Sequence, residues 1–293
     1  FDFYKKIVIP DSYKGQFEFN SYGYNKLYDT NVSESVLTND FIFSSNNFIN
    51  DNGISTNYDI LIKNSNNYSN NSLNYNDNLN YDLFGIFKVD ASYPLLRRSE
   101  NSINYLTPIL SFRYSPNGNS DLSNKDVLLN YNNVFNLNRI GSTSQVEGGE
   151  TLSLGLEFKK NSIIRSESVS LNIANIFKFD ENNSMPSKSK LDKKRSDVVG
   201  NLSYNFNENL NFEYIFSYDK DLKYSNLDQL GIDLSVNNFL TNISYHSEHN
   251  DLLDVESVIN KNKYSFDDEN KLSFELSKDL DNNFTQYYKL IYS

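Results

Sequence analysis

The feature that most constrains this chain is the alternation of apolar and polar residues between Leu202 and Tyr292. In the clearest hairpin, segments 202–206 and 210–218 carry Leu, Tyr or Phe at every second position and mostly Ser, Asn and Glu between them. A period of two is typical of a β-strand with one apolar and one polar face. Polar stretches that separate such segments lie at about 184–196, 219–229 and 247–270. Strands of this kind, joined alternately by short turns and long loops, are typical of an up-and-down β-barrel in an outer membrane.

Three short turns are expected on one side of this barrel, at 207–209, 237–238 and 281–283. Segment 64–80, which is dominated by Asn and Ser, is predicted to be a surface loop because it lies between two strand patterns. Roughly fourteen strands are expected in all, and helix signals are nearly absent. Further strand-like runs lie at 16–28, 36–48, 54–63, 81–93, 109–114, 152–158 and 169–173.

Composition excludes several other classes of protein. The chain of 293 residues is 38% hydrophobic with a mean hydropathy of -0.61, and no run of apolar residues is long enough for a transmembrane helix. A membrane barrel is compatible with this polarity, because only alternate residues face lipid. A net charge of -11 argues against a nucleic-acid partner, and the lack of cysteine excludes a disulfide framework. The 22 Tyr and 21 Phe residues suit aromatic girdles at the two membrane interfaces.

We therefore predict an all-β fold, an antiparallel up-and-down transmembrane β-barrel, with residues 1–293 as part of a single outer-membrane domain. No Ser-His-Asp arrangement, phosphate-binding glycine loop or calcium loop is recognisable, so neither catalysis nor a cofactor is expected. His246, Glu248 and His249 are poorly spaced for a metal, because on a strand His249 points away from the other two. We expect no metal site there.

A series of short motifs in the middle of the chain resembles the C-terminal barrel region of the LptD family, the outer-membrane proteins of lipopolysaccharide assembly. The resemblance rests on their order and spacing, since no single motif is specific. The motifs are Pro94-Leu95-Leu96-Arg97-Arg98, Tyr105-Leu106-Thr107-Pro108, Tyr114-Ser115-Pro116, Asn133-Val134-Phe135, Asn138-Arg139-Ile140-Gly141, Glu147-Gly148-Gly149 and Leu152-Ser153-Leu154-Gly155-Leu156.

The resemblance implies a large barrel that inserts lipopolysaccharide into the outer leaflet through a lateral gap between its first and last strands. It also implies three kinds of partner besides membrane lipid: lipopolysaccharide, an LptE-like plug lipoprotein in the lumen, and a periplasmic bridge protein that delivers the lipid to an N-terminal jelly-roll. The chain lacks a jelly-roll pattern and is short for the whole barrel, so a fragment that begins within the protein and excludes the gate strands is expected. Segment 142–145 is Ser-Thr-Ser-Gln where the family often has an acidic-basic pair.

The resemblance suggests structural or lipopolysaccharide-contacting roles for ten residues: Pro94, Arg97, Arg98, Pro108, Phe135, Asn138, Arg139, Gly141, Glu147 and Gly155. Pro94 is expected at a strand end or bulge. Arg97 and Arg98 either bind phosphate groups of the lipid or serve as ordinary charges at the rim. Arg139 is expected to lie in a loop that enters the lumen and to pair with Glu147 or Glu150.

A basic run, Lys188, Lys190, Lys193, Lys194 and Arg195, is expected in a solvated loop, with contact to an anionic leaflet as the alternative. Two other functions remain open at this point. One is a porin or nutrient receptor of the outer membrane, which would show the same alternation without the LptD-like motifs. The other is a secreted, soluble β-rich adhesin, which would bury its aromatic face between sheets.

Overall fold

The computed structural model describes residues 1–7, 10, 13–28, 31–72, 75, 77–116, 121–123, 125–249, 254–267 and 269–293. These residues form seventeen strands. The strands are β1 (Asp2–Ile7), β2 (Gly15–Tyr28), β3 (Val32–Ser45), β4 (Phe48–Ile49), β5 (Ser55–Asn70), β6 (Asn80–Ser92), β7 (Leu95–Arg98), β8 (Ser102–Ser115), β9 (Gly149–Ser162), β10 (Ser168–Lys178), β11 (Val198–Asn207), β12 (Leu210–Tyr218), β13 (Ser225–Val236), β14 (Phe239–His249), β15 (Asp254–Ser265), β16 (Lys271–Asp279) and β17 (Phe284–Tyr292). No described helix is long and apolar enough to cross a membrane.

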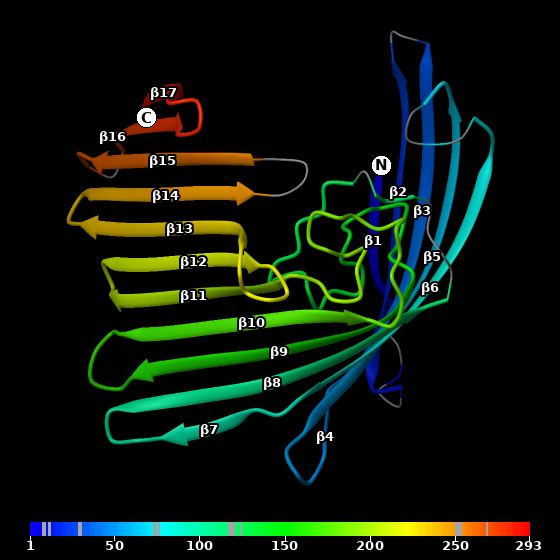
Figure 1. The fold of residues 1–293 in the computed structure, drawn as a ribbon, viewed down its shortest axis with the longest axis horizontal. Helices are drawn as coiled ribbons and strands as arrows, with labels where there is room; N and C mark the ends of the chain where they lie inside the picture. Colours follow the sequence, from blue (N-terminus) through cyan, green and yellow to red (C-terminus); the bar gives the residue numbers. More distant parts are fainter. Residues whose placement is uncertain are drawn as a thin grey trace.

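All strands belong to one antiparallel sheet in which neighbours in the chain are neighbours in space. The short strands β4 and β7 lie beside β5 and β8, so that β3 also pairs with β5 and β6 with β8. The sheet is strongly curved and open, with β1 and β17 at its two edges, and no pairing between them is made by the described residues (Figure 1). The all-β, up-and-down architecture predicted from the sequence is confirmed.

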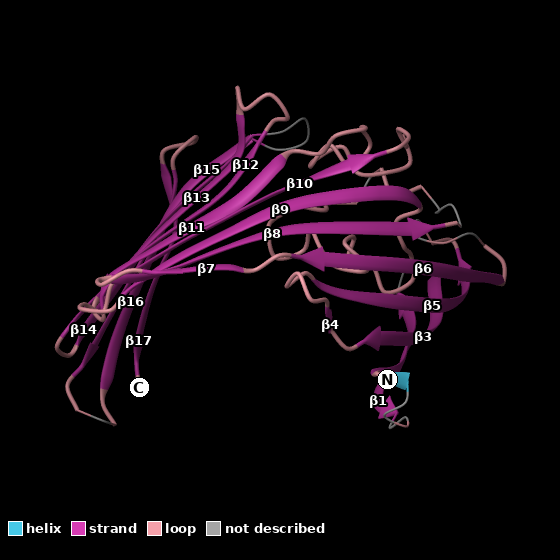
Figure 2. Ribbon diagram, turned by 90° about the horizontal axis from the view of Figure 1, so that it is seen from below, coloured by secondary structure: helices cyan, strands magenta, loops and turns pink. Residues whose placement is uncertain are grey.

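The sheet is curved, so that it has an outer and an inner face (Figure 2), and the two faces differ in polarity. On the outer face, Phe41 lies opposite Ile62, and Leu110 lies opposite Leu154. All four side chains are more than 40% exposed. On the inner face, Ser111 and Ser153 lie opposite one another and are buried. Exposed apolar side chains on one side and polar ones on the other match a sheet between lipid and an aqueous lumen.

Two predicted loops are strands in the structure. β5 continues through Asn70, so the first part of the predicted 64–80 loop is paired with the neighbouring strands of the sheet. Residues 73, 74 and 76 lie outside the described residues. The predicted 247–270 loop contains β15, while residues 250–253 and 268 are not described. Both strands carry Asn or Lys at many positions on both faces, so their sequences lack the alternation of a half-buried strand.

The additional strand β15 changes which end of the sheet carries each turn. The turns after β11 and β13 lie at one end, as predicted, together with 266–270. The turn at 280–283 lies at the opposite end, with the 179–197 and 219–224 connections, so its predicted grouping with the other two was wrong. The long connection predicted at 184–196 is confirmed, and the one predicted at 219–229 is shorter because β13 begins at Ser225.

Two long connections fold back onto the inner face of the sheet (Figure 1). We call them the inner loops: the first comprises described residues of 121–148, and the second comprises 179–197. They pack together through Leu122 and Leu129 of the first and Met185 and Leu191 of the second, against Ile176 of β10. The backbone amide of Leu122 donates to the carbonyl of Ser184 (2.7 Å). Most of the buried apolar side chains therefore lie between loops and sheet, within the curve.

Candidate functional site

The centre of the inner wall is a buried cluster of charges around Glu147, which is fully buried at the end of the first inner loop. One carboxylate oxygen, Oε2, accepts a hydrogen bond from Nε of Arg139 (2.8 Å) and forms an ion pair with Nη2 of the same guanidinium, also at 2.8 Å. The other oxygen, Oε1, lies 2.8 Å from Nζ of Lys178 at the end of β10. Arg139 also donates to Thr151 (2.9 Å) and Ser153 (3.2 Å) of β9. The structure thus pairs Arg139 with Glu147 rather than Glu150, on the inner face of the sheet.

Three further cations on neighbouring strands hold the first inner loop by its main chain. Lys63 of β5 donates to the carbonyl of Thr143 (2.7 Å), and Lys88 of β6 donates to that of Phe135 (2.9 Å). Arg113 of β8 donates to the carbonyls of Leu137 (2.9 Å) and Glu147 (2.7 Å). These contacts give loop carbonyls hydrogen-bond partners in a partly buried setting, where an unpaired carbonyl would be costly.

Strand register brings these cations together. Lys88 lies directly opposite Arg113, Arg113 opposite Thr151, and Thr151 opposite Lys178. Like charges in directly opposed positions repel one another unless acids or carbonyls compensate them. Two carboxylates on the sheet compensate Lys88: Asp59 at 3.2 Å and Asp90 at 2.8 Å. Lys63 is paired with Asp40 at 2.7 Å.

The electrostatics of the loop favour an ionised Glu147. Burial by itself raises the pKa of this carboxyl, but the nearby charges of Arg139, Lys178 and Arg113 outweigh burial and lower the pKa below its ordinary value. Glu147 is therefore a carboxylate at neutral pH.

Burial and the Glu157 carboxylate, which accepts a hydrogen bond from Tyr131 at 2.8 Å, raise the pKa of the Tyr131 hydroxyl.

The remaining predicted site residues of the first inner loop shape its path. Nδ2 of Asn138 donates to the carbonyls of Ser142 (2.9 Å) and Gln145 (3.3 Å) and so closes the turn that contains Gly141. Gly141 has a φ of 68°, a conformation that favours glycine. Phe135 lies directly on Gly155 of β9, which has no side chain to obstruct the ring. The structure thus brings Phe135, Asn138, Arg139, Gly141, Glu147 and Gly155 together.

The other predicted residues lie apart from this cluster. Pro94 lies between the end of β6 and the start of β7, and Pro108 lies on β8 opposite the same break, where its carbonyl accepts a hydrogen bond from Tyr93 (3.1 Å). Proline has no N–H to donate, which suits an interruption of the ladder. Arg97 and Arg98 are exposed on β7, at the end with the short turns, and form no ion pair with another described residue. Their roles remain predictions.

The basic run divides into buried and exposed residues, so the prediction of a fully solvated loop was wrong for Lys188. Lys188 is buried and its Nζ lies 2.5 Å from Asp126 of the first inner loop and 2.6 Å from Glu248 of β14. It therefore connects both inner loops to a distant strand. Lys193 and Lys194 are exposed, and the guanidinium of Arg195 lies 5.5 Å from the ring centre of Phe177.

The second inner loop ends at a buried acid, Asp197. Its Oδ2 accepts hydrogen bonds from Asn226 of β13 (2.9 Å) and Ser217 of β12 (3.3 Å). Burial raises the pKa of Asp197 to about 6, although these two hydrogen bonds and the charge of Lys190 act in the opposite direction. This carboxyl therefore changes protonation closer to neutral pH than an ordinary aspartate does.

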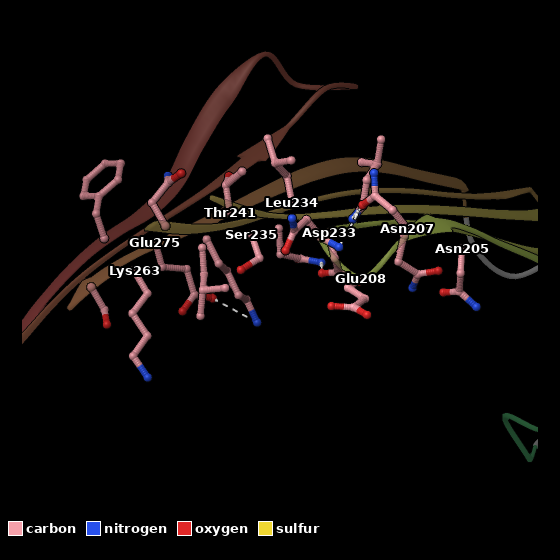
Figure 3. A pocket seen from close by; sticks show the side chains of 18 of the residues that line it. Asn205, Asn207, Glu208, Asp233, Leu234, Ser235, Thr241, Lys263 and Glu275 are labelled. Atoms are coloured by element: carbon pink, nitrogen blue, oxygen red, sulfur yellow. Dashed lines mark hydrogen bonds and ion pairs between the residues drawn. The ribbon is translucent and has the colours of Figure 1, made fainter. Parts of the chain in front are cut away.

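A polar belt crosses the inner face of the last seven strands, at the end with the short turns. We define the polar belt as Asn205, Asn211, Asp233, Asn242, Lys261, Glu275 and Lys289, each directly opposite the next on adjacent strands. Asn242 donates to Asp233 (2.7 Å), and Lys261 lies 3.6 Å from Glu275. The belt lines a hollow of about 740 Å³, in which Lys263 projects away from the sheet (Figure 3). Amides and charges of both signs can bind hydroxyl groups.

The three residues considered for a metal do not converge on one point. Nε2 of His246 lies 3.7 Å from Glu248, whereas His249 pairs with Asp254 and lies 3.6 Å from Glu256. Within the described residues, no group of three His, Cys, Asp or Glu side chains has the arrangement of a metal site.

Sequence reasoning missed Lys63, Lys88, Arg113 and Lys178, which hold the inner loops. Arg113 and Lys178 are each the single charge of their strand, whereas Lys63 and Lys88 share their strands with aspartates. Only the register shows which of these cations meet. A charge at an inward position of a strand was the available signal, because such a charge needs a buried partner.

Comparison with known proteins agrees with the motifs. No curated protein matches the chain. The model of the family described as LptD, LPS transport system D, matches residues 24–272. This match covers β3 to β15 and both inner loops. The chain therefore belongs to the LptD family of lipopolysaccharide transport.

Proposed function

We propose that this chain forms a wall of the outer-membrane barrel through which lipopolysaccharide is inserted into the outer leaflet. The observation that carries the proposal is the difference in polarity between the two faces of the last seven strands. The polar belt lies on the inner face, while Ile232 and Ile243, from positions adjacent to belt residues, are 42% and 46% exposed on the outer face. A sheet of this kind separates a hydrated saccharide from hydrocarbon.

In the proposed mechanism the inner face binds the saccharide part of the lipid while the acyl chains enter the membrane sideways. The asparagine amides of the belt offer both donors and acceptors to sugar hydroxyls, and Asp233, Glu275, Lys261 and Lys289 add charged partners. The step makes and breaks no covalent bond, so no catalytic residue or cofactor is assigned. A plug lipoprotein within the lumen and a periplasmic bridge protein that delivers the lipid are the proposed partners.

Photocrosslinking in cells tests this proposal. A photoreactive residue is placed at Asn211 or Glu213, which face the lumen, and at Phe212, which faces outward, in the full-length protein. We expect adducts with lipopolysaccharide or with a lipoprotein from positions 211 and 213, and neither adduct from position 212. Because the three positions are consecutive, Phe212 controls for position along the strand.

Three results would contradict the proposal. Equal lipopolysaccharide adducts from all three positions would mean that the lipid does not distinguish the two faces. Recovery of the protein in the soluble fraction without adducts would instead favour a secreted β-rich adhesin. A porin or nutrient receptor would place the protein in the membrane fraction and give no lipopolysaccharide adduct from positions 211 and 213.

A further inference from the structure

The charge cluster around Glu147 contains more positive than negative charge. Arg113, Arg139 and Lys178 surround one carboxylate, so the four side chains carry a formal charge of +2. The side chains of Arg139, Lys178 and Glu147 are only 1%, 4% and 0% exposed, and Arg113 is 2% exposed. Buried charge without a counter-charge is unfavourable, and solvent does not screen it here.

The cluster also contains a buried guanidinium donor that no described residue accepts. Arg139 donates to Oε2 of Glu147, and Nζ of Lys178 lies 2.8 Å from Oε1. Arg113 donates only to the carbonyls of Leu137 and Glu147, and its Nη1 has no hydrogen-bond partner among the described residues. A buried guanidinium group with an unsatisfied N–H is therefore close to an anion that already has two strong donors.

We propose that this cluster is a binding site for a phosphate monoester and that Glu147 occupies it when no ligand is present. A phosphate monoester carries a charge between -1.5 and -2 near neutral pH and three terminal oxygens. It would match the excess charge better than one carboxylate and would give the Nη1 of Arg113 an acceptor. Two arginines are also suited to phosphate because the guanidinium fork matches its geometry.

Ligand binding at this site displaces Glu147 and so loosens the first inner loop. Glu147 lies two residues before Gly149, whose φ of 90° is a conformation that glycine adopts readily. Because Gly149 is the first residue of β9, a backbone rotation there would change the direction of the loop segment that carries Glu147 relative to the strand. Because the same loop is held on the sheet by Lys63, Lys88 and Arg113, arrival of the anion weakens one of several anchors. The inference rests on the proposed function, in which the ligand is a phosphate group of the transported lipid.

The test compares Glu147→Gln with wild type in the full-length protein in detergent micelles, using inorganic phosphate as the probe. The amide keeps the shape of the side chain but removes the competing charge. We expect the dissociation constant for phosphate, from the shift in melting temperature with ligand concentration, to fall at least ten-fold. Glu150→Gln, which changes an exposed neighbouring carboxylate, should bind phosphate as wild type does. Sodium chloride at equal ionic strength controls for screening.

If Glu147→Gln does not fold, Glu147→Asp keeps the charge but shortens its reach, and it should bind phosphate more tightly than wild type. Adding Arg113→Ala to either variant should remove the gain. Equal affinities of wild type and the Glu147 variants for phosphate, or equal stabilisation by chloride, would overturn the proposal.

A second arm identifies the source of the phosphate. Lipopolysaccharide should stabilise Glu147→Gln more than the same lipid after enzymatic dephosphorylation. Stabilisation by inorganic phosphate alone would overturn the assignment to the transported lipid. The crosslinks from Asn211 and Glu213 test transport separately, since those positions lie outside the cluster. Their presence without phosphate binding would overturn this inference and leave the proposed function standing.

Discussion

The ring of Phe135 in the first inner loop fills the space beside Gly155 of β9 that a side chain at position 155 would need. A Cβ added to Gly155 would lie 2.5 Å from Cζ of the ring. We therefore predict that Gly155→Ala lowers the free energy of unfolding by about 1–3 kcal/mol, as expected for overpacking. Gly85→Ala is the matched control, because a Cβ there meets no atom within 4 Å. Urea unfolding in detergent micelles measures both. Adding Phe135→Leu should recover part of the loss, and a Gly155 variant no less stable than the control would contradict this packing.

Glu147→Ala should be the most destabilising single change in the cluster. It leaves Arg139 and Lys178 without their carboxylate, and breaking a buried ion pair costs about 3–5 kcal/mol. Arg139→Ala should cost less, because Lys178 still neutralises Glu147. Glu150→Ala, on the exposed neighbour, should change stability by less than about 0.5 kcal/mol. Thermal unfolding of the three variants gives the order, and a larger loss for Arg139→Ala than for Glu147→Ala would disprove it.

Asp197 should make stability fall as pH rises. Its pKa of about 6 in the folded protein lies above the ordinary value of 3.8 because the group is buried. Its stabilising contribution is complete below pH 3.8 and is lost as the pH passes through about 6. The free energy of unfolding of wild type relative to Asp197→Asn should thus decrease by about 2 kcal/mol from pH 4 to pH 7. A constant difference between the two proteins across this range would show that Asp197 titrates normally.

Lys188→Met should loosen the second inner loop. The change removes the contacts to Asp126 and Glu248, and we expect a loss of about 1–3 kcal/mol, typical for a buried charged group that loses its partner. Amide hydrogen exchange within 185–192 should accelerate, because this segment then has fewer anchors. Lys194→Met, in the same loop but exposed, should leave exchange unchanged. Equal exchange rates in the two variants would show that Lys188 does not anchor the loop.

The sequence predicts the strands whose two faces differ in polarity and fails where they do not. Segments 202–206 and 210–218 alternate, and they lie in β11 and β12 as expected. β15 and the end of β5 have polar residues on both faces. Their pairing depends on backbone hydrogen bonds, which do not require any pattern of side-chain polarity. Phe84 and Ile86 interrupt the alternation of β6 because they face inward and pack with Val146 of the first inner loop.

The candidate site could be predicted only in part. Arg139 and Glu147 lie eight residues apart in one loop, so a pairing within the lumen follows from local sequence. Arg113 and Lys178 come from strands whose neighbours are fixed by the register with β9, which no short motif encodes. The polar belt could likewise not be recognised in the sequence, because its seven residues come from seven strands.

The first inner loop is bound to the sheet largely through the carbonyl groups of Phe135, Leu137, Thr143 and Glu147. Every residue supplies a carbonyl, so mutation of a side chain at position 143 leaves its anchor intact. An insertion or deletion between 135 and 147 would instead change the spacing of the carbonyls, which could then no longer all reach Lys63, Lys88 and Arg113. Natural variation should therefore change the residue at position 143 more freely than it changes the length of the loop.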